Sequence, residues 1–141
     1  MNAAIVSKIH KLHADLVRAV VRLKEALALP PTRIHKDATI QRFEFCFELS
    51  WKLLQSLVID QGLSSYGPKN AIRVAAQAGI IDNPAAWLKM LDARNLTTHV
   101  YKEKTADEVY KQIKHFPPLV DQLLSAASAQ QLLFEDVGEK K

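Results

Sequence analysis

Apolar residues recur at three- and four-residue spacing in the first part of the chain, and this pattern predicts an amphipathic helix. The apolar stripe consists of Ile5, Ile9, Leu12, Leu16, Ala19 or Val20, Leu23 and Leu27. Such spacing places the residues on one face of an α-helix, where they can be buried together. The adjacent prolines Pro30 and Pro31 are expected to stop this helix, and its other faces carry basic residues that we expect to be solvated.

The next segment is apolar around most of a helical circumference. We expect Asp37 to be its N-cap and Gly62 to mark its end. One side gathers Ile40, Phe43, Phe47, Trp51, Leu54, Leu57 and Val58, and the other gathers Phe45, Cys46, Leu49 and Leu53. The narrow polar stripe that remains consists of Gln41, Glu44, Glu48, Lys52 and Gln55. A helix that is apolar on two sides is expected to lie at the centre of a bundle, or to line a dimer interface as well.

Two shorter helices follow, each with a recognisable beginning. The first is expected after Pro68 and ends at Gly79, which is the usual order of proline and glycine at helix ends. The second is expected after Asn83, with Pro84 in its first turn, and it carries Trp87 and further apolar residues. Both segments contain enough apolar residues to pack one face against a neighbouring helix.

The last predicted helix opens with "TADE", in which Thr105 and Glu108 have the spacing of a capping box. Apolar residues continue at helical spacing from Val109 as far as Ala127, so a long helix is expected. Pro117 and Pro118 should kink or briefly break it. The charged tail, about residues 135–141, is expected to be frayed.

These elements together predict an all-α protein. The chain has 141 residues and four glycines, and it shows no alternation of apolar and polar residues of the kind that strands require. This length suits one domain with a proper core and is short for two. We therefore expect a single domain over residues 1–141, folded as an up-and-down bundle of four to five helices.

Composition and charge narrow the classes of function only a little. Hydrophobic residues make up 48% and charged residues 24%, as in ordinary globular proteins. A net charge of +4 mildly favours an anionic partner such as nucleic acid. The single cysteine, Cys46, excludes an internal disulfide and is expected to be a small buried hydrophobe. Neither a signal peptide nor an apolar run of the ~20 residues that span a membrane is recognisable, so a cytoplasmic location is expected.

The stretch "RNLTTHVY", residues 94–101, carries the candidate chemistry. On one continuous helix Arg94 and Tyr101 would share a face, because they are seven residues apart. Asp92, Asn95 and His99 would share a second stripe. Arg94 and His99 would point about 140° apart on an ideal helix, so they converge only if the helix loosens near Thr97 and Thr98, or if a second copy supplies the missing group.

These residue types suit metal-independent cleavage of RNA. Such cleavage needs a base for the ribose 2′-hydroxyl, an acid for the leaving oxygen and a cation for the developing negative charge. Histidine titrates near neutral pH and can serve in either proton role. Arginine presents donors that match phosphate oxygens. Since one copy has one histidine here, a two-fold dimer with the two motifs face to face would make a complete site.

Structural readings of the same residues stay open at this point. His99 could be a satisfied histidine near the core, Arg94 an ion-pair partner and Tyr101 a packing aromatic, and spacing alone favours that interpretation. His10, His13, His35 and His115 show no metal-ligand pattern, so no metal and no other cofactor is expected. Glu44, Glu48 and Lys52 could line a polar groove, or form a solvated stripe in which Glu48 pairs with Lys52.

Three segments in order resemble one known family. Arg94-x4-His99-x-Tyr101 resembles the signature of HEPN domains that are encoded beside minimal nucleotidyltransferases. The segment "QRFEFCFELSWKLLQ" resembles the second helix of that subgroup, including its two glutamates and Trp51-Lys52. The segments "YGPKNAIRVAAQAGIID" and "DARN" also fit, so the resemblance covers about residues 3 to 130.

This resemblance implies a dimerising helical bundle and two readings of its function. In the first, the protein is the toxin of a toxin–antitoxin pair, a metal-independent endoribonuclease with Arg94 and His99 as catalytic residues. Asn95, Thr98 and Asp92 would support them, and the cognate nucleotidyltransferase antitoxin would transfer AMP to Tyr101. In the second, the protein is a non-catalytic substrate-binding subunit of a two-component nucleotidyltransferase. An inert dimeric scaffold is a third alternative. The implied partners are a second copy, the minimal nucleotidyltransferase protein and, for the toxin, RNA, with no membrane.

Overall fold

Six α-helices and one short 3-10 helix make up the part of the chain that the structure describes. This computed structural model describes residues 3–139, with side chains for residues 3–131. In chain order the elements are α1 (Ala3–Leu27), α2 (Arg33–Asp60), α3 (Gly67–Gln77), α4 (Pro84–Leu96), η1 (Thr97–His99), α5 (Glu103–Ile113) and α6 (Phe116–Glu139). The predicted all-α class is confirmed. Within residues 3–139, no helix has both the length and the apolar character needed to cross a bilayer.

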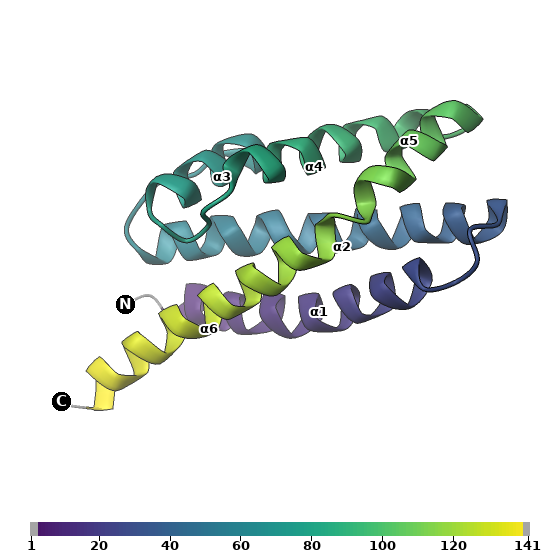
Figure 1. Ribbon diagram of the computed structural model, residues 1–141. Coiled ribbons are helices and arrows are strands. Elements are labelled where there is room, and N and C mark those ends of the chain that lie inside the picture. Colours follow the sequence, from purple (N-terminus) through teal and green to yellow (C-terminus); the bar gives the residue numbers. More distant parts are fainter. Residues whose placement is uncertain (1–2, 140–141) are drawn as a thin grey trace.

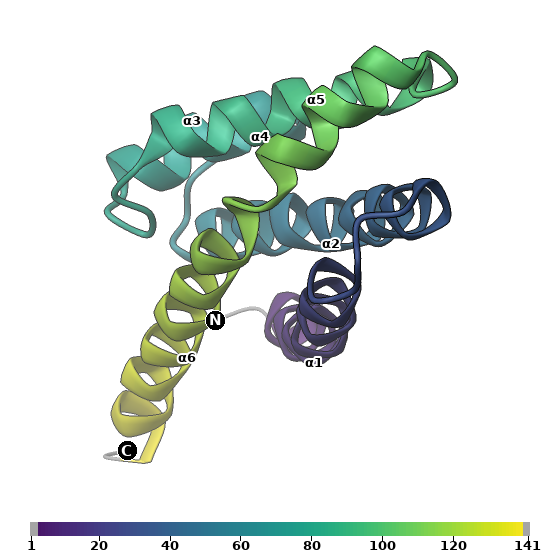
Figure 2. The ribbon, with the colours of Figure 1, turned by 45° about the vertical axis from the view of Figure 1, so that its right-hand side comes forward.

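The long helix α2 is the centre of the bundle. It contacts α1, α3, α4, α5 and α6. Figure 1 and Figure 2 show α1 on one side of α2 and the layer of α3, α4 and α5 on the other, while α6 crosses from that layer towards α1. Most residues on both apolar sides of α2 are buried by these neighbours, whereas Leu49 and Trp51 are half-buried and Phe45 is 58% exposed. The expectation that this helix is central is confirmed.

Two predicted helix starts are wrong, and both real helices begin earlier. Asp37 is not the N-cap of α2, because the Thr32 side chain caps it one turn earlier by accepting a hydrogen bond from the His35 amide at 3.2 Å. Thr105 does not open a capping box, since α5 already begins at Glu103 and its cap position has no side-chain hydrogen bond. In both places the capping residues suggested by the pattern lie inside the helix.

The last predicted helix is divided into α5 and α6, which raises the number of α-helices above the predicted four to five. The expected break is confirmed, and it falls at Lys114 and His115. Pro117 and Pro118 lie in the first turn of α6, where the missing N–H groups would have no helical partner in any case. The tail predicted to be frayed continues α6 as far as Glu139, and residues 140–141 lie outside the described residues.

An aromatic cluster around Phe116 joins three helices. The Phe116 ring meets Phe43 and Trp87 edge-on, at centroid distances of 5.2 Å and 5.6 Å, and lies 5.9 Å from Phe47. All four side chains are buried. These contacts hold the start of α6 against α2 and α4, close to the α5–α6 break.

Cys46 is fully buried in α2, as predicted. Removal of the thiol from water raises its pKa to about 12, because burial disfavours the charged thiolate. The thiol therefore stays protonated at neutral pH and takes no part in nucleophilic chemistry.

Phe116→Ala should lower the free energy of unfolding by about 3–5 kcal/mol, because it leaves a cavity where three helices meet. Urea denaturation followed by circular dichroism measures this change. Tyr66→Ala is the matched control, since Tyr66 is 80% exposed and its ring should contribute little. Equal effects of the two substitutions would contradict the described core.

Candidate functional site

The helix that carries Arg94 ends within the candidate motif. α4 stops at Leu96, and residues 97–99 tighten into the 3-10 helix η1. The hydroxyl of Thr97 donates to the Arg94 carbonyl at 2.7 Å, and that of Thr98 donates to the Asn95 carbonyl at 3.3 Å. Such hydroxyl bonds to preceding carbonyl groups compete with regular helical pairing. The helix thus loosens near Thr97 and Thr98, which is one of the two conditions named above for Arg94 and His99 to converge.

Arg94 is held by an acidic residue on α2. Its Nε donates to Glu48 Oε1 at 3.2 Å, and its Nη2 lies 3.2 Å from the same oxygen. The other carboxylate oxygen of Glu48 accepts a hydrogen bond from the indole N–H of Trp51 at 3.1 Å. Arginine has five N–H donors, and Nη1 of Arg94 has no hydrogen-bond partner within residues 3–131. The guanidinium is therefore oriented and can still bind an anion.

His99, the last residue of η1, and Tyr101 lie side by side on the surface. Their ring centres are 6.1 Å apart with an interplanar angle of 68°, and Tyr101 is 75% exposed. Within the described side chains, neither the imidazole nitrogens nor the Tyr101 hydroxyl makes a hydrogen bond. The Lys102 amide donates to the His99 carbonyl at 3.2 Å, which closes the turn between η1 and α5.

The expectation that Arg94 and Tyr101 share one helix face is wrong, because η1 and the following turn interrupt the helix between them. Tyr101 instead neighbours His99. No hydrogen bond joins the side chains of Arg94 and His99 among the described residues. One copy of the chain thus presents an arginine with a spare donor group and a separate exposed imidazole.

The remaining candidate residues occupy different surroundings. Asn95 and Thr98 are exposed within the motif, and Asp92 is exposed and lines a cavity of about 350 Å³ between α4 and α5. On α2, Glu44 is half-buried and Lys52 is exposed. Glu48 pairs with Arg94 and Trp51, which differs from the pairing with Lys52 that a solvated stripe would show.

Two other histidines outside the motif have structural partners. His13 lies within hydrogen-bond distance of the Leu124 carbonyl and the Ser128 hydroxyl, and His35 Nδ1 lies 2.7 Å from the Pro30 carbonyl. In the part of the chain that the structure describes, there is no group of three or more His, Cys, Asp or Glu side chains that could hold a metal ion.

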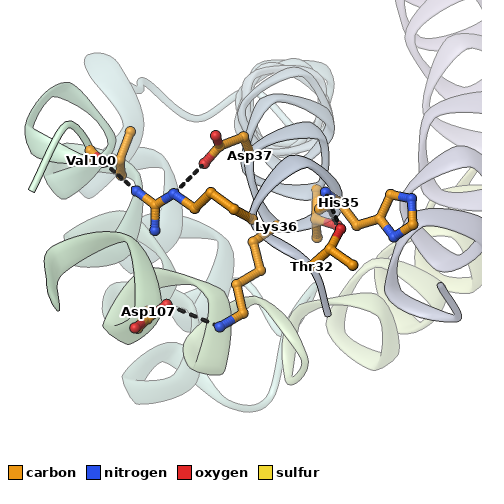
Figure 3. Close-up of polar contacts among 8 residues, drawn as sticks. Thr32, His35, Lys36, Asp37, Val100 and Asp107 are labelled. Carbon is orange, nitrogen blue, oxygen red and sulfur yellow. Dashed lines mark hydrogen bonds and ion pairs between the residues drawn. The ribbon is translucent and has the colours of Figure 1, made fainter. Parts of the chain in front are cut away.

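Two contacts near the site could not be predicted from the helical pattern of the sequence. The first turn of α2 lies against the turn after η1 and against α5, because Arg33 contacts the Val100 carbonyl and Lys36 contacts Asp107. Figure 3 shows Lys36 beside Asp107 and the dashed contact to Val100. Arg33 and Lys36 stand about 70 positions before their partners in the chain, so no helical spacing relates them. The first turn of α2 carries basic residues and no acidic one, although the helix dipole favours acidic residues there. This local feature is the one signal in the sequence that could have indicated a role for Arg33 and Lys36.

The structure is an all-α bundle with an Arg–His motif at a helix end. Comparison with known proteins identifies the family. A model of the family described as "Nucleotidyltransferase substrate binding protein like" matches residues 11–129. The chain belongs to this family. The resemblance to HEPN domains paired with minimal nucleotidyltransferases is thereby confirmed.

Individual relatives agree with this assignment. A probable ribonuclease HepT from Haemophilus influenzae is 37% identical over 82 residues, which are 55% of this chain and 56% of that protein, so the chain matches about half the length of this relative. A crystal structure of a protein from Thermus thermophilus is 34% identical with a TM-score of 0.75, covering 79% of this chain and 98% of that one. A tri-AMPylated HEPN toxin from Shewanella oneidensis, solved in complex with an MNT antitoxin, has the same fold. Its TM-score is 0.70 at 20% identity, with 92% and 99% covered.

Glu48 and Arg94 should be energetically coupled. Because both side chains are partly exposed, at 37% and 29%, a double-mutant cycle with Glu48→Ala and Arg94→Ala should give about 0.5–1 kcal/mol of coupling in urea denaturation. The cycle of Glu44→Ala with Arg94→Ala is the control, since Glu44 lies one turn earlier on the same helix. Coupling as large in the control cycle would show that the ion pair is not specific.

Proposed function

We propose that the protein is a HEPN toxin, a metal-independent endoribonuclease that acts as a homodimer and is neutralised by a cognate nucleotidyltransferase antitoxin. The observation that carries this proposal is the pairing of an oriented Arg94 with an exposed, unbonded His99 five residues later. The partial identity to a probable ribonuclease HepT supports the same chemistry.

The chemistry assigns one role to each side chain. The ribose 2′-hydroxyl attacks the neighbouring phosphorus, its proton passes to a base, and the bond to the 5′ oxygen breaks as that oxygen takes up a proton. Imidazole can carry out either proton transfer. The free Nη1 group of Arg94 would donate to the phosphate oxygens as their negative charge grows. Glu48 keeps that group pointed away from α2.

A second copy would supply the second imidazole, because one chain has one histidine in the motif. Phe45, on α2 one turn before Glu48, is 58% exposed and so is available for contact with another chain. In a two-fold dimer whose axis passes close to the motif, the Arg94 and His99 side chains of both copies would meet at one site.

Neutralisation by AMP transfer fits the position of Tyr101. The exposed hydroxyl would attack the α-phosphorus of ATP and release pyrophosphate, which leaves AMP on the phenol oxygen. Because the Tyr101 ring lies beside His99, the added phosphate would occupy the space in front of the imidazole. An anion there would repel the RNA backbone and block access to His99.

The alternative function is a non-catalytic substrate-binding subunit of a two-component nucleotidyltransferase. The description of the matching family favours this reading, and the cavity between α4 and α5 could hold part of a target. The two functions differ in one observable property, since a binding subunit would not cleave RNA on its own.

The unmodified protein should cleave RNA in the presence of EDTA, and Arg94→Ala or His99→Ala should lower the rate about 100-fold or more. Cleavage of a fluorescent RNA measures the rate. His115→Ala is the control, because this exposed histidine lies at the α5–α6 break and should not matter. Absence of cleavage by the unmodified wild type, or equal rates in all variants, would favour the binding subunit.

Tyr101→Phe should cleave RNA like the wild type but escape neutralisation. After incubation with the partner nucleotidyltransferase and ATP, intact-mass measurement should show AMP on the wild type and none on this variant. Tyr66→Phe is the matched control, since Tyr66 is 80% exposed and Tyr101 75%. If Tyr101→Phe gains AMP as readily as Tyr66→Phe, the modification lies elsewhere.

A further inference from the structure

The first turn of α2 is tied to the backbone between His99 and Tyr101. Arg33 Nη2 donates a hydrogen bond to the Val100 carbonyl at 3.3 Å, and Val100 is the single residue that separates the two functional side chains. Arg33 Nε lies 3.6 Å from Asp37 Oδ1, one turn further along α2. Figure 3 labels Asp37 and Val100 and marks a dashed contact to each of them. Asp37 thus orients the guanidinium, and the guanidinium holds the turn.

A second tie from the same helical turn reaches α5. Lys36 Nζ lies 3.0 Å from Asp107 Oδ1 and 5.5 Å from the centre of the Tyr110 ring. Figure 3 shows this contact below the Arg33 contact, on the neighbouring α5 ribbon. The start of α2 therefore contacts the chain both at residue 100 and at residue 107.

The held segment has few bonds of its own. η1 is a single 3-10 turn, a geometry with weaker hydrogen bonds than an α-helix, and α5 begins without a side-chain cap. The side chains of His99 and Tyr101 are exposed and make no hydrogen bond among the described residues. Apart from the contact between the two rings and a Lys102 Nζ group 5.9 Å from the centre of the Tyr101 ring, the directions of these side chains depend on the backbone of the turn. The Val100 carbonyl is the point at which Arg33 of α2 binds that backbone.

We propose that Arg33 is a positioning residue that fixes the turn between His99 and Tyr101, and that α2 thereby sets the geometry of both halves of the motif. Glu48 orients Arg94 at one point along α2, and Arg33 orients the His99–Tyr101 turn near its start. The inference rests on the proposed function for its effect on activity, and on the structure alone for its effect on the turn.

Arg33→Met removes the donor and keeps much of the side-chain length. Since small displacements of a catalytic group cost much rate, we expect kcat for RNA cleavage to fall roughly 10-fold with KM changed less than about twofold. AMP transfer to Tyr101 should slow as well, because the acceptor hydroxyl sits on the same turn. Arg33→Lys keeps a cationic donor and should recover part of both rates.

Arg42→Met is the matched control. Arg42 also lies on α2, its Nη1 donates to a backbone carbonyl, that of Arg22, at 2.7 Å, and its side chain is 41% exposed against 39% for Arg33. It also has an acidic neighbour, Glu25, at 3.9 Å. The two substitutions remove the same kind of contact, but only one of them touches the motif.

Hydrogen–deuterium exchange tests the inference without reference to activity. Peptides covering residues 97–102 should exchange faster in Arg33→Met than in the wild type, while Arg42→Met leaves them unchanged. If exchange in this segment is the same in both variants, Arg33 does not hold the turn and the inference is overturned. If the segment loosens in Arg33→Met but the wild type neither cleaves RNA nor accepts AMP, the proposed function fails and the positioning role stands. Loss of kcat to the same extent in both variants would also overturn it.

Discussion

The ion pair between Arg94 and Glu48 connects the end of α4 to the middle of α2, and the anion-binding half of the site depends on it. An arginine near the end of a helix has a long and mobile side chain, and binding a phosphate would require ordering it. Here the hydrogen bond to Glu48 already orders the Arg94 side chain, and the Trp51 indole N–H donates a hydrogen bond that holds Glu48 in place. Because α4 ends two residues after Arg94, the helix cannot transmit that position to His99. The first turn of α2 supplies the missing restraint through the Val100 carbonyl. Helix α2 thus positions both Arg94 and the His99–Tyr101 turn, although none of these residues belongs to α2.

This arrangement explains how one family can carry two descriptions. A bundle that presents an oriented guanidinium on its surface can bind an anionic target, which is what a substrate-binding subunit must do. Cleavage needs more, namely two proton transfers by correctly placed groups. A single copy has one imidazole at the site, and among the described residues no hydrogen bond joins it to Arg94. Under the proposed mechanism, binding and catalysis differ in whether two copies bring their motifs together.

Much of the fold could be predicted from the sequence, because helical periodicity and proline or glycine at helix ends are local signals. The end of α1 before Pro30, the start of α4 at Pro84 and a break near Pro117 follow from such signals. The starts of α2 and α5 were predicted wrongly, because the capping patterns at Asp37 and Thr105 compete with helical turns that begin just before them. The loosening at Thr97 and Thr98 could be predicted from their side chains. The partners of Arg94 and Val100 could not, since they lie 46 and 67 residues away in the chain and are brought together by tertiary packing.

The most direct test of the account is the RNase activity of a heterodimer made from one wild-type chain and one Arg94→Ala/His99→Ala chain, purified through two different tags. A site that needs both copies would be disabled by one defective chain. The account predicts that this heterodimer is as inactive as the homodimer of the double variant, while the wild-type homodimer purified in the same way is fully active. About half of the wild-type activity in the heterodimer would mean that each chain carries a complete site, which would contradict the account.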